Sequence, residues 1–111
     1  MKIVSSKDAK VEELREYKMT TGICNIQDDG EFEIGTVLFK PNSRIPAEGF
    51  GRHDFDEYAY VIKGSIDSQI GEERYNIEAG QFSFIPKGLK HWSQNNSKSD
   101  CEIVWFKVKS K

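Results

Sequence analysis

The sequence has few of the residues that mark a disulfide scaffold, a structural zinc site or a membrane span. Its two cysteines, Cys24 and Cys101, stand far apart, each inside an apolar run. Because they lack metal-type spacing, we expect reduced core residues and no disulfide. No run of about 18 apolar residues is present, and residues 1–5 lack the apolar core of a signal peptide. We therefore predict a soluble, cytoplasmic protein.

An excess of one charge is also missing. Lysine and arginine number 16 and aspartate and glutamate 18, for a formal net charge of −2, without long single-sign runs. Nucleic acids and anionic membranes attract strongly basic surfaces, so we expect neither as a partner. Glycine-rich phosphate loops and the residue order of serine hydrolases are absent as well. These absences remove phosphate-loop and serine-nucleophile enzymes from the candidates.

What the sequence does contain is a series of short, strand-like runs between turn signals. Residues 27–30 and 71–73 read as hairpin turns, and residues 6–16 carry too few apolar positions for more than one short helix. Many short strands at such intervals indicate an all-β sandwich or barrel. With 111 residues, the chain is long enough for one domain and one core.

One of the two histidines lies just after a turn between two strand-like runs. Pro86 fixes its own φ and Gly88 accepts a positive φ, so the chain is expected to reverse there. In the run that follows, His91, Ser93 and Asn95 share one face because side chains alternate along a strand. The pattern predicts that His91 begins a strand.

The other histidine lies close to a glutamate. On a regular strand Gly51, His53 and Glu57 point to the same side, so His53 and Glu57 can converge, with His91 arriving from a neighbouring strand. Two imidazoles and one carboxylate form the ligand set of mononuclear non-haem iron with open coordination positions. The same ligands suit manganese, nickel and zinc, so the identity of a divalent transition metal stays open.

The histidine after the turn is part of a longer spacing pattern. The pattern consists of Gly80, Pro86, Gly88, His91 and Asn95, with five, one, two and three residues between them in turn. This is the second signature motif of the cupin superfamily, which the chain resembles.

The first cupin motif is present in its second half, as His53, Glu57 and Gly64. The earlier histidine position of that motif holds Gly51, and its leading glycine position falls on Ile45. The resemblance implies four metal ligands, which are three histidines and a glutamate. The chain lacks one of these histidines.

The resemblance covers residues 34–109, with residues 1–33 as an N-terminal segment, and implies a single jelly-roll β-barrel domain. It also implies a first-row divalent ion and a homodimer. The apolar run of residues 101–108, with Ile103, Trp105 and Lys107 on one face, is a candidate contributor to the dimer.

Two alternatives exist for the metal ligands. Glu48, in a loop with flexible glycines, is a candidate to replace the missing ligand. In the other alternative His53, Glu57 and His91 form a degenerate site without metal, with His91 hydrogen-bonded to Asn95 or a nearby serine.

Candidate ligand-binding residues flank this centre. Phe55 shares the inward face of His53 and Glu57, and Phe50 and Asn95 lie beside the motif histidines. The sequence leaves three functions open. They are a metal-dependent oxygenase, isomerase or lyase acting on a small organic molecule, a non-catalytic sensing barrel similar to the effector domain of arabinose-type regulators, and metal-free sugar epimerase chemistry.

Overall fold

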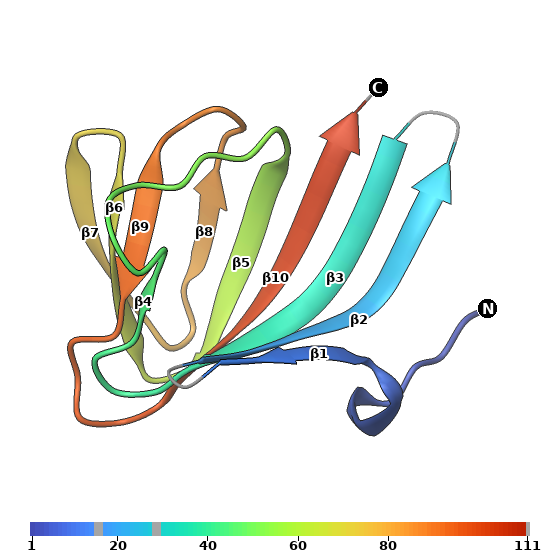
Figure 1. The fold of residues 1–111 in the computed structure, drawn as a ribbon, viewed down its shortest axis with the longest axis horizontal. Coiled ribbons are helices and arrows are strands. Elements are labelled where there is room, and N and C mark those ends of the chain that lie inside the picture. Colours follow the sequence, from blue (N-terminus) through green and yellow to red (C-terminus); the bar gives the residue numbers. More distant parts are fainter. Residues whose placement is uncertain (15–16, 28–29, 111) are drawn as a thin grey trace.

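Two antiparallel β-sheets close around one core (Figure 1). The computed structural model describes residues 1–14, 17–27 and 30–110. The strand order is β1-β2-β3-β10-β5-β8 in the larger sheet and β4-β9-β6-β7 in the smaller one. The strands are β1 (Lys10–Glu13), β2 (Tyr17–Gln27), β3 (Gly30–Phe39), β4 (Arg44–Ile45), β5 (Asp56–Lys63), β6 (Ser65–Ile70), β7 (Glu73–Glu78), β8 (Phe82–Ile85), β9 (His91–Gln94) and β10 (Cys101–Ser110).

The prediction of an all-β jelly roll with at most one short helix is confirmed. Within the described residues, helical structure is limited to one 3₁₀ turn, η1 (Ser6–Asp8). Both predicted hairpins form, because β2 pairs with β3 as far as Gln27 and Gly30, and β6 pairs with β7 as far as Ile70 and Glu73. Residues 28 and 29 of the first turn lie outside the described residues.

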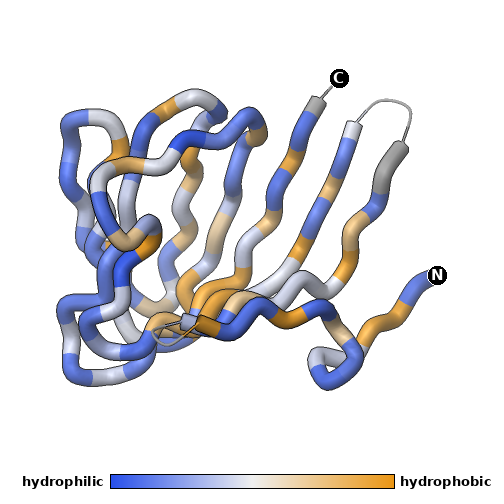
Figure 2. Tube along the Cα trace, viewed as in Figure 1, coloured by the Kyte–Doolittle hydropathy of each residue, from blue (hydrophilic) through white to orange (hydrophobic). Residues whose placement is uncertain are grey.

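The core lies between the sheets because apolar and polar residues alternate along the strands (Figure 2). β10 runs through the middle of the larger sheet between β3 and β5. Its inward residues Ile103 and Trp105 are buried against Val37 and Phe39 of β3 and Val61 of β5. The larger sheet thus supplies most of the buried apolar residues.

Close packing inside this sheet depends on one glycine. Gly35 in β3 is paired with Trp105 in β10, and the indole of Trp105 lies where a Cβ at position 35 would be. Such a Cβ would overlap the carbonyl oxygen of Thr20 and the Cζ2 atom of Trp105. Glycine at this position therefore allows the indole to lie flat against the sheet.

The cysteines differ from one another. Cys101 is fully buried, and burial raises the pKa of its thiol to about 11. Cys24 is exposed, so its assignment to the core was wrong. A register shift between Thr21 and Ile23 interrupts the pairing of β2 with β3 just before this position, so simple alternation does not apply there. None of the helical structure described is long and apolar enough to cross a bilayer.

Candidate functional site

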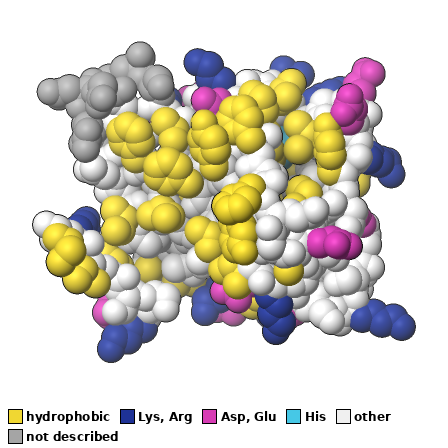
Figure 3. Space-filling model, turned by 180° about the vertical axis from the view of Figure 1, so that it is seen from behind, with side chains coloured by type: hydrophobic (Ala, Val, Ile, Leu, Met, Phe, Trp, Pro, Cys, Tyr) yellow, Lys and Arg dark blue, Asp and Glu magenta, His cyan; other side chains and the backbone are white. Residues whose placement is uncertain are grey.

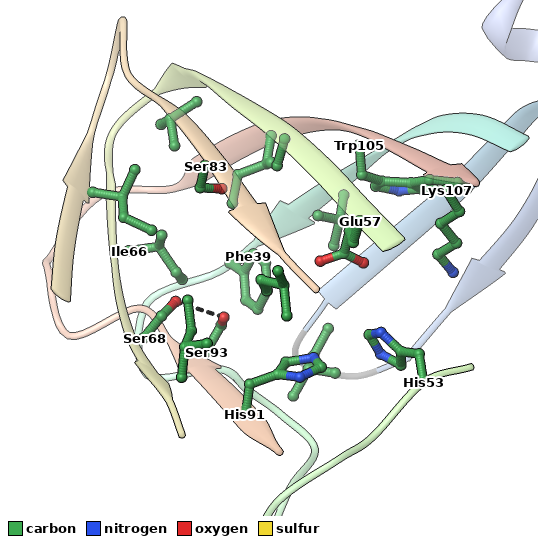
Figure 4. A pocket seen from close by; sticks show the side chains of 18 of the residues that line it. Phe39, His53, Glu57, Ile66, Ser68, Ser83, His91, Ser93, Trp105 and Lys107 are labelled. Atoms are coloured by element: carbon green, nitrogen blue, oxygen red, sulfur yellow. Dashed lines mark hydrogen bonds between the residues drawn. The ribbon is translucent and has the colours of Figure 1, made fainter. Parts of the chain in front are cut away.

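A cavity of about 130 Å³ lies between the two sheets. Its wall is mostly aliphatic and comes from both sheets, including Val61, Ile66, Ile77, Ile85 and Ile103. Four ionisable side chains line it together: His53, Glu57, His91 and Lys107 (Figure 4). An apolar pocket with a few convergent polar groups is the usual form of a small-molecule site.

His91 begins β9, as the turn at Pro86 and Gly88 predicts. Its side chain is 8% exposed, and Nδ1 lies 3.1 Å from the carbonyl oxygen of Leu89. A carbonyl only accepts, so Nδ1 carries the proton and donates. In the neutral ring, Nε2 is then the free acceptor nitrogen.

His53 does not lie on the same regular strand as Glu57, which corrects the sequence-based expectation. β5 begins at Asp56, and His53 belongs to the preceding connection. That connection is held by two backbone hydrogen bonds between Gly51 and His91, of 2.8 and 2.9 Å, and by a 2.8 Å bond from Gly88 N–H to the carbonyl of His53. These long-range contacts, and not strand alternation, bring His53 to the cavity.

The ring of His53 is placed by two other rings. It stacks on Phe55, with centroids 4.3 Å apart and planes at 11°, and meets the edge of His91 at 4.4 Å and 71°. Burial lowers the pKa of His53 to about 4, and the nearby charges of His91 and Lys107 add to the shift. His53 is therefore a neutral imidazole at pH 7.

Glu57 points inward from β5, and its carboxylate faces the cavity (Figure 4). Burial raises its pKa, while His91 and Lys107 oppose that effect. The hydrogen bonds and ion pairs within residues 1–14, 17–27 and 30–110 provide no partner for this carboxylate. Glu57 thus offers a desolvated acceptor to whatever enters the cavity.

Lys107 is the site residue that the sequence-based reasoning missed. It lies opposite Glu57 in the pairing of β10 with β5 and lines the cavity. Alternation had placed Lys107 on one face with Ile103 and Trp105. Trp105 is buried, which identifies that face as the inner one. The alternation of the sequence therefore contained the information that Lys107 shares the inner face.

Four other predicted residues do not line the cavity, and Asn95 is one of them. Glu48 is exposed in the loop before Gly51, Phe55 lies behind the ring of His53, and Phe50 is 44% exposed beneath the ammonium of Lys90. In this arrangement Phe55 orients a cavity residue, and Glu48 and Phe50 face solvent.

Asn95 is completely buried, but its amide is used inside the protein. Its Nδ2 donates to the carbonyl oxygens of Phe39 and Ser99, at 3.0 and 2.8 Å. Its Oδ1 accepts from the backbone N–H and the hydroxyl of Ser97, at 3.0 and 2.7 Å. Asn95 therefore joins the end of β3 to the loop before β10 instead of facing the cavity.

Comparison with known proteins identifies the family. Residues 29–107 match the family model described as the cupin domain, which is more than half of the chain. The chain belongs to the cupin family. In this cupin the second motif is complete, whereas Gly51 stands at the position where the first motif has its first histidine.

Individual relatives cover different shares of this cupin. An uncharacterized HTH-type transcriptional regulator, YdeC, from Bacillus subtilis (strain 168) is 30% identical over 56 residues, which is 50% of this chain and 19% of the regulator. The chain thus spans about a fifth of that relative's length. A structure described as a predicted oxalate decarboxylase from Thermotoga maritima has a TM-score of 0.81 and 18% identity, with 97% of this chain and 99% of that chain covered.

The Fe(II) form of HppE, solved with the alternative substrate (S)-1-HPP, has a TM-score of 0.74 and 12% identity. The alignment covers 96% of this cupin and 59% of that chain. At such low identity these structures establish the fold alone.

The predicted metal ligands lie around one cavity but do not form a closed ligand group. In the part of the chain that the structure describes, no three histidine, cysteine, aspartate or glutamate side chains come together as a group that could hold a metal ion. His53 and His91 are neighbours, but Lys107 brings a positive charge to the same wall. Like charges repel, so the ammonium disfavours a divalent cation there. The arrangement does not fit a metal centre as it stands.

Proposed function

We propose that this cupin binds a small, largely apolar organic molecule in the cavity between its sheets. The observation that carries the proposal is the combination of an aliphatic wall with four ionisable side chains at one place. A cavity of about 150 Å³ lined by apolar side chains holds one benzene ring, and this one, of about 130 Å³, is close to that size. The ligand is therefore small, with a polar group that meets His53, His91, Glu57 or Lys107.

The similarity to part of a transcriptional regulator favours a binding or sensing role over an enzymatic role. Sugar epimerase chemistry of the type expected from the sequence needs a tyrosine acid opposite the histidine. Among the described residues, no tyrosine lines the cavity, and Tyr58 lies on the outer side of β5. Binding is thus the first candidate.

Ligand binding is tested by NMR with the two tryptophans as paired reporters. Trp105 lines the cavity, and its buried Nε1–H has no hydrogen-bond partner in the described part of the chain. Trp92 lies outside the cavity between Arg44 and Arg74. In a panel of small acids, amides and alcohols, a bound compound is expected to shift the indole signal of Trp105 and to leave that of Trp92 in place.

The control is a variant with a filled cavity. Ser83 lines the cavity from β8, and Ser83→Leu adds apolar volume there. We expect this variant to keep its β-rich spectrum and to bind the same compound at least about tenfold more weakly, because leucine occupies the ligand's space. Shifts that survive in this variant, or that occur only at surface residues, would contradict the proposal.

A divalent transition metal held by His53, Glu57 and His91 is the second candidate. It is favoured by the hydrogen bond from His91 Nδ1 to Leu89, which leaves Nε2 as a potential ligand, and by the neutral His53 beside it. A metal would have to draw the carboxylate and both imidazoles closer together. When bound, it would supply a Lewis acid with open coordination positions.

The metal candidate is tested by element analysis after incubation with iron, manganese, nickel or zinc and desalting. It predicts one ion per chain in the wild type, loss of that ion in His91→Ala, and retention in Asp54→Ala. Asp54 is exposed and paired with Lys109, so it is a matched control. Equal trace amounts of metal in all three proteins would rule out a metal site formed by His53, Glu57 and His91.

We also propose a homodimer that forms through the outer face of the larger sheet. Figure 3 shows hydrophobic side chains in a row across the rear of the molecule. Tyr58 of β5 contacts Phe84 of β8 at 4.8 Å and Phe106 of β10 at 6.4 Å between ring centroids, and these three rings are 46%, 48% and 37% exposed. Large exposed apolar patches usually mark interfaces, and a second copy presents the same surface. The cytoplasmic location stays a prediction.

A further inference from the structure

Lys107 has an unusual position for a lysine. Among the described residues it is the only lysine or arginine that lines the cavity. Lysine normally keeps its ammonium in water, whereas this side chain is half-buried on the same face of β10 as Trp105. It lines the cavity and also a surface pocket that it shares with Glu31, Glu33 and Asp54. Figure 4 shows it at the same end of the cavity as Glu57 and His53.

Two aromatic rings keep the ammonium near the cavity. Lys107 Nζ lies 4.6 Å from the ring centroid of Trp105 and 4.9 Å from that of Phe55. Both contacts are within the range of a cation–π interaction, which strengthens as the cation loses water. Phe55 also stacks on His53, so the same ring positions a cationic and a neutral hydrogen-bond donor. The positive charge is therefore held in a defined place.

No carboxylate neutralises this charge by direct contact. In the described ranges Lys107 has no salt bridge, whereas Lys109, two residues further on, bonds to Asp54 at 2.8 Å. Glu57 faces Lys107 in the strand register, but no ion pair forms between them. The ammonium thus keeps donors available for a further anionic group.

We propose that Lys107 binds the carboxylate of a small organic acid whose apolar part fills the cavity. The proposal rests on the small-molecule function proposed above and adds the ligand class to it. Lys107 is then the residue that makes the site prefer an acid over a neutral molecule of the same shape.

The charge of Glu57 predicts the direction in which a substitution should change the binding affinity for an acid. Its carboxylate lines the same cavity and repels an anionic ligand, while Lys107 attracts it. Removing the charge of Glu57 should therefore tighten binding of an acid, whereas removing the charge of Lys107 should weaken it. A cationic ligand would reverse both effects, and a neutral ligand would be nearly insensitive to them.

The experiment compares two acid–amide pairs by NMR titration, benzoate with benzamide and butyrate with butyramide. The two compounds of each pair have nearly the same shape, but only the acid carries a negative charge. We expect at least one acid to bind the wild type about tenfold or more tightly than its amide. Lys107→Met should abolish that preference, because methionine keeps an unbranched apolar chain beside Trp105 and Phe55 but has no charge.

Three further variants complete the test. Lys107→Arg should keep the preference for the acid, Glu57→Gln should raise acid affinity, and Lys109→Met should change nothing, because its charge pairs with Asp54 outside the cavity. Amide binding that equals acid binding, in both wild type and Lys107→Met, would overturn the role of Lys107 and leave the binding cavity intact. If no member of either pair nor any compound of the wider panel moves the Trp105 signal, both proposals fall.

Discussion

Replacing Gly35 by alanine is expected to lower the free energy of unfolding by about 3 kcal/mol or more, one of the largest effects available to a single methyl group in this chain. The added Cβ would overlap the carbonyl oxygen of Thr20 on one side and the indole of Trp105 on the other. A backbone oxygen in a paired strand cannot move without breaking the sheet. Any movement of the indole would displace a buried residue that belongs to the core and also lines the cavity.

The measurement is chemical denaturation followed by circular dichroism, with Gly51→Ala as the matched control. A Cβ at Gly51 would lie 3.7 Å from Pro46 Cδ, which is an ordinary contact, so the control is expected to change stability by less than about 1 kcal/mol. Thermal midpoints should differ by roughly 10 °C between the two variants. Equal stability would mean that Trp105 does not lie flat on Gly35.

Replacing Phe84 by lysine is expected to convert a dimer into a monomer. In the proposed two-fold interface the row of Tyr58, Phe84 and Phe106 faces its own copy, so each substitution places two ammonium groups in an apolar contact. Burying unpaired charge costs several kcal/mol, which raises the dissociation constant by about two orders of magnitude or more. Light scattering should give twice the chain mass of 12.7 kDa for the wild type and the single mass for the variant.

The control for this prediction is Tyr75→Lys. Tyr75 is 46% exposed, close to the value of Phe84, but it lies on β7 of the smaller sheet. The substitution removes an aromatic ring of comparable exposure that borders the same surface groove as Phe84 but is not part of the row of Tyr58, Phe84 and Phe106, so it should leave the mass unchanged. A wild type that has the monomer mass at all accessible concentrations would refute the dimer, and dissociation by Tyr75→Lys alone would move the interface to the other sheet.

Local chemistry in the sequence was sufficient to place His91. The turn at Pro86 and Gly88 and the alternation that follows are short-range features, and β9 begins where they predict. His53 was assigned to a strand it does not belong to, because its position depends on the bridge between Gly51 and His91, which are forty residues apart in the chain. No local pattern reports such a contact.

The role of Lys107 required a different kind of information. Its face could be read from alternation with Trp105, but its neighbours could not, since they depend on β10 lying between β3 and β5. That order places a strand from the end of the chain beside one from its middle. Asn95 illustrates the opposite case, because a motif residue next to a candidate ligand serves packing, through its bonds to Phe39 and Ser99.

The two backbone hydrogen bonds between Gly51 and His91 tie the connection that carries His53 to the smaller sheet. The bonds therefore link the position of His53 to the strand that begins with His91 and help to hold the two imidazole rings in contact. A local opening that breaks this pair of bonds frees the connection and separates His53 from His91 in the same event.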